Sequence, residues 1–84
     1  SQFTVRIERT PKKFIKGLQS SDRKRIDAAL SLLATNPIPP LAKKLTGREA
    51  YRIRVGNYRI LYEIHKNVLV VLVIDVGHRR EIYR

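Results

Sequence analysis

The chain has 84 residues and no cysteine, so it forms one domain with a single core and has no disulfide framework, thiolate metal site or cysteine nucleophile. Eighteen Lys and Arg residues against seven Asp and Glu give a formal net charge of +11. Such an excess indicates a polyanionic partner: nucleic acid, an anionic membrane surface or an acidic protein.

Alternation of apolar and polar residues predicts a first strand around Phe3, Val5 and Ile7. Thr10 and Pro11 then predict the start of a short helix, with threonine at the N-cap and proline at the first helical position.

A second helix is predicted after the capping signal of residues 20–22, because Ile26, Ala29, Leu30 and Leu33 follow at helical spacing. The two helices should form a hairpin. Residues 36–40 contain three prolines and therefore predict a connecting loop.

A β-hairpin is predicted from residues 51–55 and 58–62, which alternate polar with apolar around Gly56-Asn57, a pair suited to a two-residue turn. In that register Arg54 lies opposite Arg59, and Arg52, Arg54 and Arg59 share one face of the sheet, called the arginine face below. Opposed like charges destabilise a sheet by some tenths to about 1 kcal/mol. We interpret the cluster as the site of an absent anion.

Residues 68–76 are almost all β-branched or leucine and predict a central strand buried on both faces. With a two-residue turn at Lys66-Asn67, Arg59 would face Ile74, and the same parity places Val76 and His78 on the arginine face. The opposite, helix-covered face should carry Tyr51, Ile53, Val55, Tyr58, Ile60, Tyr62 and Ile64.

The predicted order β-α-α-β-β-β indicates an α+β fold, with two N-terminal helices packed on one face of a mostly antiparallel four-stranded sheet. Residues 1–84 should form a single domain. The longest apolar run, residues 68–74, is too short to cross a bilayer, and no signal peptide is evident. Because the basic residues are spread along the whole chain rather than along one amphipathic helix, a membrane surface is the weakest partner. We expect a soluble cytoplasmic protein.

Four short motifs occur in order: Lys44-Leu-Thr-Gly47, Tyr51-Arg-Ile-Arg54, Tyr58-Arg-Ile-Leu-Tyr62 and Gly77-His-Arg-Arg-Glu-Ile-Tyr83. With them the whole chain resembles the RelE/ParE superfamily of bacterial and archaeal toxin-antitoxin toxins, and within it the RelE branch. The resemblance implies a RelE-like fold and an endoribonuclease that cleaves messenger RNA on the ribosome. It implies no metal or other cofactor, and attack by the ribose 2′-hydroxyl on the adjacent phosphate.

By the same resemblance, the residues expected to act on the phosphate are Arg52, Arg54, Arg59, Arg79 and Tyr83. Strand parity adds His78, which precedes Arg79 in the chain. Preorganised cations stabilise the charge that develops on phosphate oxygens, and the arginine fork can hold two oxygens at once. Tyr83 would stack on a base or orient the scissile nucleotide. Further RNA contacts are expected from Lys43, Lys44, Arg48, Arg80, Arg23 and Lys24.

A general base is not obvious. Members of the family often carry lysine where this chain has Arg52 and Arg54, and arginine practically cannot accept a proton. His78 is the first choice because imidazole titrates near neutrality. Glu49, Glu81 and Tyr83 remain alternatives.

The partner implied by the resemblance is an antitoxin whose acidic or amphipathic segment complements the net charge. Three other interpretations stay open. The arginine face can be a solvated surface, the chain can be a ParE-type toxin that inhibits gyrase without cleaving RNA, or it can be a catalytically inactive RNA-binding homologue.

Overall fold

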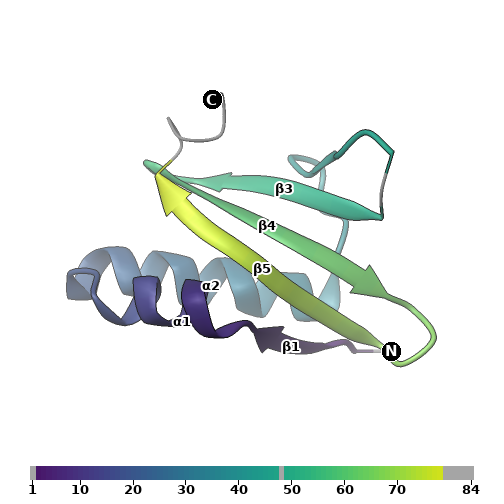
Figure 1. Ribbon diagram of the computed structural model, residues 1–84, viewed down its shortest axis with the longest axis horizontal. Coiled ribbons are helices and arrows are strands. Elements are labelled where there is room, and N and C mark those ends of the chain that lie inside the picture. The colour runs from purple at the N-terminus through teal and green to yellow at the C-terminus, as the bar shows by residue number, and fades with distance from the viewer. Residues whose placement is uncertain (1, 48, 79–84) are drawn as a thin grey trace.

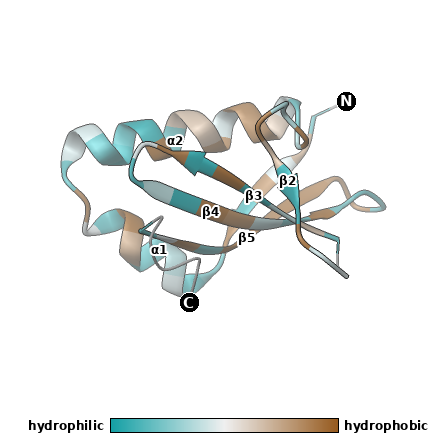
Figure 2. Cartoon of the chain, turned by 90° about the horizontal axis from the view of Figure 1, so that it is seen from above, coloured by the Kyte–Doolittle hydropathy of each residue, from teal (hydrophilic) through white to brown (hydrophobic). Residues whose placement is uncertain are grey.

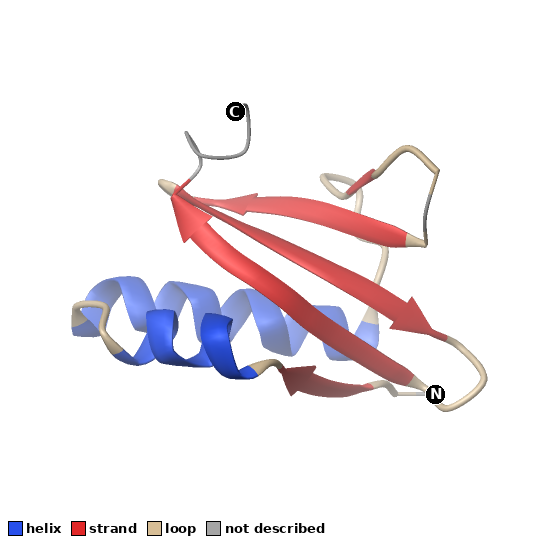
Figure 3. Cartoon of the chain, in the orientation of Figure 1, coloured by secondary structure: helices blue, strands red, loops and turns tan. Residues whose placement is uncertain are grey.

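The computed structural model describes residues 2–47 and 49–78, and within them the chain forms two helices and a five-stranded sheet (Figures 1 and 3). The elements in chain order are β1 (Thr4–Ile7), α1 (Arg9–Lys16), α2 (Ser20–Thr35), β2 (Lys43–Lys44), β3 (Ala50–Val55), β4 (Tyr58–His65) and β5 (Val70–His78). The predicted α+β fold is confirmed. The predicted strand number is corrected from four to five, because the two-residue β2 adds an edge strand.

The strand order is β1-β5-β4-β3-β2, so the first and last strands are neighbours. β1 runs parallel to β5, and the other pairs are antiparallel. The two helices lie between β1 and β2 in the chain and cover one side of the sheet (Figure 1). Neither helix in the described ranges is long and apolar enough to span a membrane.

The core lies between the helices and the sheet. Ile26, Leu30 and Leu33 of α2 pack against the inner faces of β3, β4 and β5. The predicted helix-covered set is confirmed: its most deeply buried members are Ile60 and Tyr62, each fully inaccessible to solvent. Hydrophilic and hydrophobic stretches alternate along β3 and β4 in Figure 2, as expected for strands with one covered and one open face.

Both helices begin without a side-chain cap. α1 starts at Arg9 after Glu8, so the prediction of Thr10 as N-cap is wrong by two residues. Pro11 still lies in the first turn, where a missing N–H leaves no hydrogen bond unmade. α2 starts at Ser20 after Gln19.

The β3–β4 hairpin has the predicted register, with Arg54 opposite Arg59 and Arg52 opposite Leu61. Gly56 has a φ of 59°, a left-handed conformation that glycine adopts without a Cβ penalty. Turn chemistry and alternation therefore suffice to fix this part of the sheet.

The β4–β5 connection differs from the prediction. His65 pairs with Val70, so the turn has four residues, 66–69, rather than two. Val68 and Leu69 are exposed in this turn, and Leu69 has a φ of 53°. Apolar character alone does not mark where a strand begins. Because the turn is longer than predicted by an even number of residues, this difference alone does not change which face each side chain of β5 occupies.

A β-bulge then reverses the parity. Tyr62 pairs with Val73, but Leu61 pairs with Asp75, so Ile74 is an extra residue on β5. Beyond the bulge Arg59 faces Gly77 rather than Ile74.

Val76 is 3% exposed within the core cluster. The prediction that Val76 and His78 lie on the arginine face is therefore wrong. One inserted residue moves every later side chain of a strand to the opposite face.

Candidate functional site

The arginine face is the side of the sheet that the helices leave open. Its side chains stand in rows across the strands because paired residues point the same way. Two adjacent rows contain most of its charge: Arg54, Arg59 and Gly77 form one, and Lys43, Arg52, Leu61 and Asp75 form the other.

Arg59 is the most constrained residue of these rows. Its side chain is only 8% exposed, and its Nη2 lies 3.2 Å from Oδ2 of Asp75. Its Nε and Nη1 atoms are buried and have no hydrogen-bond partner within the described part of the chain. Because an unsatisfied buried donor costs about 1–3 kcal/mol, this guanidinium is suited to receiving acceptor oxygens from outside the domain.

Arg52 and Arg54 supply a second cationic region next to Arg59. Arg54 is exposed and Arg52 is half-buried. Together with Leu41 and Lys43 they line a cavity of about 270 Å³. An anionic group entering this cavity would meet three cationic side chains.

Asp75 is a site residue that the sequence analysis did not identify. It is the acidic residue paired directly with Arg59, and its side chain is 43% exposed. Its signal in the sequence is a single carboxylate within the apolar run of β5. Strand parity without the bulge would have placed it under the helices, where a charge is costly.

His78 does not join the arginine face. It pairs with Tyr58, and its ring centroid lies 5.2 Å from that of Tyr58 and 6.0 Å from that of Phe14 in α1. The ring therefore packs on the helix-covered side of the sheet. Its expected position beside the arginines is corrected, because the bulge turned it to the other face.

The other basic residues expected to bind RNA are dispersed. Lys43 lies in the arginine rows, opposite Arg52. Lys44 pairs with Glu49 at 2.8 Å, and this hydrogen bond raises the pKa of the Lys44 amine and lowers the pKa of the Glu49 carboxyl. Glu49 is thus tied to a lysine at the hairpin's far end.

Arg23 and Lys24 belong to α2, in the helix layer. The Arg23 guanidinium donates to the carbonyl oxygens of Lys16 and Leu18 at 3.4 and 3.3 Å and so braces the turn between the helices. Neither residue is brought to the arginine face. The remaining predicted site residues, Arg48, Arg79, Arg80, Glu81 and Tyr83, lie outside the described residues.

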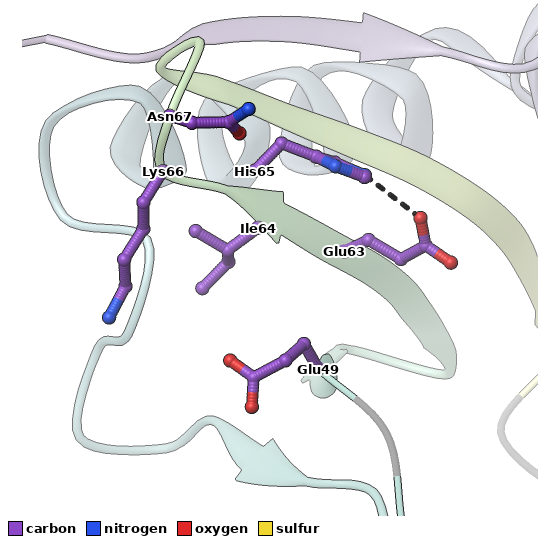
Figure 4. A pocket seen from close by; sticks show the side chains of 6 residues that line it. All are labelled: Glu49, Glu63, Ile64, His65, Lys66 and Asn67. Atoms are coloured by element: carbon purple, nitrogen blue, oxygen red, sulfur yellow. Dashed lines mark hydrogen bonds and ion pairs between the residues drawn. The ribbon is translucent and has the colours of Figure 1, made fainter.

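A separate cavity of about 490 Å³ lies at the opposite end of β4 (Figure 4). Its lining includes Glu49 and Glu63, and His65 Nε2 lies 3.0 Å from Oε1 of Glu63. Two carboxylates make this cavity unfavourable for a polyanion. Among the described residues no group of three or more His, Cys, Asp or Glu side chains is arranged to hold a metal.

Comparisons with known proteins agree with this architecture. Residues 3–83 match the family model described as the ParE toxin of type II toxin-antitoxin systems. The chain is 30% identical over 87 residues to the protein named RelE1 of Methanocaldococcus jannaschii, covering 99% of this chain and 97% of that one.

Two solved structures extend the likeness to the fold. A mutant of the E. coli toxin RelE in the free state superposes with a TM-score of 0.82 at 25% identity, over 99% of this chain and 92% of that chain. The RelB-RelE antitoxin-toxin complex of Methanococcus jannaschii gives a TM-score of 0.71 at 32% identity, over 93% and 94% of the two chains.

Proposed function

Because the chain belongs to the RelE/ParE superfamily of type II toxin-antitoxin toxins, we propose that it is an endoribonuclease that cleaves messenger RNA on the ribosome. The observation that carries the proposal is the buried guanidinium of Arg59, which lies opposite Arg54 and has two buried donors with no acceptor among the described residues. Opposed like charges and buried donors without acceptors cost folding free energy, and a bound anion would offset that cost.

In the proposed mechanism the scissile phosphate binds between Arg54 and Arg59, and the ribose 2′-hydroxyl attacks it. The attack builds negative charge on the phosphate oxygens. Guanidinium groups already fixed in place stabilise that transition state more than the ground state, and need no reorganisation as the charge grows. Arg52 and Lys43 hold the neighbouring phosphate in the cavity that they line with Arg54.

Two further residues, Arg79 and Tyr83, are assigned to the site by family resemblance alone. Arg79 would add a fourth cation, and Tyr83 would stack on a base, a contact worth about 1–3 kcal/mol. In this mechanism no metal is required, because the nucleophile comes from the RNA and the arginines stabilise the negative charge on the phosphate oxygens.

The test is to map cleavage of messenger RNA on translating ribosomes. We expect the wild-type chain to cut within the codon at the decoding site. Arg54→Ala should lower the cleavage rate by about 10²-fold, the usual effect of removing one transition-state donor. Lys66→Ala removes the same charge from the exposed β4–β5 turn and should cleave at the wild-type rate. Equal rates in the two variants would refute the assignment of the site.

A second function is kept because the matching family model is that of the ParE toxin. A ParE-type chain would inhibit DNA supercoiling by gyrase and leave RNA intact. Purified protein that inhibits supercoiling and fails to cleave ribosome-bound RNA would establish this alternative. An inactive RNA-binding homologue would do neither, yet bind RNA in a salt-dependent manner.

A cognate antitoxin is the protein partner that the relatives support, since one of them is a RelB-RelE complex. An apolar groove of about 370 Å³ lies between α2, the proline-rich loop and β3, and its lining includes Arg54. Its rim carries Leu32 and Leu41, which are 67% and 79% exposed. An amphipathic segment with acidic residues at one end would fit both the groove and the arginines.

Leu41→Asp tests this docking site. It should weaken antitoxin binding by at least about 10-fold, because a charge would enter an apolar interface. Val68→Asp is the matched control, since Val68 is 62% exposed in the distant β4–β5 turn. Similar affinities for the two variants would show that the antitoxin binds elsewhere.

A further inference from the structure

We propose that Asp75 is the general base that removes the proton from the attacking 2′-hydroxyl. The inference rests on the endoribonuclease function proposed above and adds the group that this reaction lacks. Arginine practically cannot take up a proton, so Arg52, Arg54 and Arg59 can bind and stabilise charge without activating the nucleophile. A proton acceptor must stand beside them.

The bulge in β5 is what brings a carboxylate to this face. Without the extra residue Ile74, Asp75 would point into the core and Ile74 would stand among the arginines. With it, Asp75 lies opposite Leu61 and one row from Arg59. Bulges occur often beside active sites, where they redirect a side chain. Here the redirected residue is the only charged one in β5 before His78.

The position of the carboxylate suits proton transfer. Oδ2 of Asp75 lies 3.2 Å from Nη2 of Arg59, while 43% of the Asp75 side chain remains exposed. A phosphate held by the buried donors of Arg59 would therefore lie next to the carboxylate. The 2′-hydroxyl is on the same sugar whose 3′ oxygen carries that phosphate, so a phosphate bound at Arg59 brings the hydroxyl close to Asp75.

The step balances without a further reactant except water. A carboxylate oxygen of Asp75 takes the 2′-hydroxyl proton, and the 2′ oxygen forms a bond to phosphorus. The bond from phosphorus to the 5′ oxygen breaks, and that oxygen leaves with a proton from solvent. The products are a 2′,3′-cyclic phosphate and a 5′-hydroxyl end, and Asp75 returns its proton to water.

The other titratable groups on the described part of the chain are less well placed. Glu63 shares the arginine face but is four residues from Arg59 along β4, about 13 Å in a strand, and it lies against His65. His78 packs against Tyr58 and Phe14 on the covered side. Among the carboxylates and imidazoles of the described residues, Asp75 is the one that both contacts Arg59 and is open to solvent.

A simpler role for Asp75 would be to neutralise Arg59 until RNA displaces it. The two roles make opposite predictions for Asp75→Asn, which keeps the size of the side chain and removes its basicity. A neutralising residue would leave cleavage unchanged or faster when lost. A general base would leave RNA binding intact, or stronger, and slow the chemical step.

The experiment measures single-turnover cleavage of ribosome-bound messenger RNA and, separately, the affinity for the same RNA with a 2′-deoxy scissile nucleotide. For Asp75→Asn we expect a rate about 10²–10⁴-fold lower with affinity equal to or above that of the wild type. Asp75→Glu should recover part of the rate. Glu63→Gln, an acid-to-amide change on the same face, should cleave at the wild-type rate.

Wild-type cleavage rates in Asp75→Asn would overturn the inference and leave the nuclease function standing. Loss of RNA affinity in parallel with cleavage, or loss of the folded state in both Asp75→Asn and Asp75→Glu, would also overturn it and assign Asp75 a structural role. A wild-type chain that cleaves no RNA would refute the nuclease function itself.

Discussion

The two faces of the sheet are built from the same strands but differ in how completely their polar side-chain atoms are paired. On the helix-covered face the hydroxyl groups of Tyr62 and Tyr58 are matched. Tyr62 donates from Oη to the carbonyl oxygen of Pro37 at 2.7 Å, and Tyr58 donates to Oδ2 of Asp22 at 2.8 Å. Each bond ties the sheet to the helices or to the loop that follows them.

On the arginine face the polar atoms of Arg59 are matched only in part within the described residues. Arg54 and Arg59 stand opposite each other, and Arg59 keeps two buried donors without an acceptor in the described part of the chain. Its ion pair with Asp75 leaves that carboxylate partly open to solvent. Alternation along β3 and β4 therefore places residues that stabilise the fold next to residues that reduce its stability.

From this difference between the two faces we expect Arg59 to be needed for RNA cleavage and not for stability. We expect Arg59→Leu to lower RNA cleavage by at least about 10²-fold, because a fixed transition-state cation is lost. The same change should leave the free energy of unfolding unchanged or raise it by about 1–3 kcal/mol, since it removes two buried donors that have no acceptor among the described residues, and Asp75 stays exposed enough to be solvated. Chemical denaturation and single-turnover cleavage measure the two effects. A less stable Arg59→Leu would show that the arginine serves the fold.

The adjacent residue in β4 should behave in the opposite way. Ile60→Ala removes a fully buried side chain of the core and should cost about 2–5 kcal/mol of unfolding free energy. Cleavage per folded molecule should stay within about two-fold of wild type. If Ile60→Ala instead slowed the chemistry of the folded fraction, the two faces would be coupled and the contrast between them would not hold.

The contrast also marks where sequence reasoning succeeds. The β3–β4 register followed from a two-residue turn and strict alternation, both local signals, and it placed Arg52, Arg54 and Arg59 together as observed. The helix-covered set of the hairpin followed from the same parity. Family resemblance then supplied a phosphate as the missing anion.

Sequence reasoning failed beyond Tyr62. A bulge has no composition signal of its own, because Ile74 resembles any other residue of an apolar strand. Missing it reversed the faces of Asp75 and His78, so the imidazole was expected at the site and the carboxylate was not considered. The residue that the bulge exposes is the one carboxylate of this otherwise apolar strand.

Tyr62 offers a smaller test of the covered face. Tyr62→Phe leaves the carbonyl of Pro37 without its donor and should cost about 0.5–1.5 kcal/mol of unfolding free energy. RNA cleavage should be unchanged. A neutral effect on stability would mean that water replaces the hydroxyl at the loop.

The difference in unfolding free energy between the wild type and Tyr62→Phe should depend on pH. Burial raises the pKa of the Tyr62 phenol to about 12, whereas the unfolded chain loses that proton near pH 10. The stabilising effect of the protonated phenol is thus complete below about pH 10 and is lost as the pH rises toward 12. Between these values the wild type should lose up to about 1.4 kcal/mol of stability per pH unit more than Tyr62→Phe. Denaturation curves for both proteins at pH 9, 10 and 11 measure the difference.

The smallest expected effect concerns Tyr58, whose hydrogen bond to Asp22 raises the pKa of its phenol. Asp22→Asn replaces a carboxylate with a weaker neutral acceptor, so the phenol pKa should fall toward its ordinary value, as followed by NMR of the ring carbon that bears the hydroxyl. Stability and RNA cleavage should change little, because the bond lies at the partly open end of the covered face. A loss of cleavage in Asp22→Asn would connect this end of β4 to Arg59 through the strand, and would show that the helices also shape the arginine face.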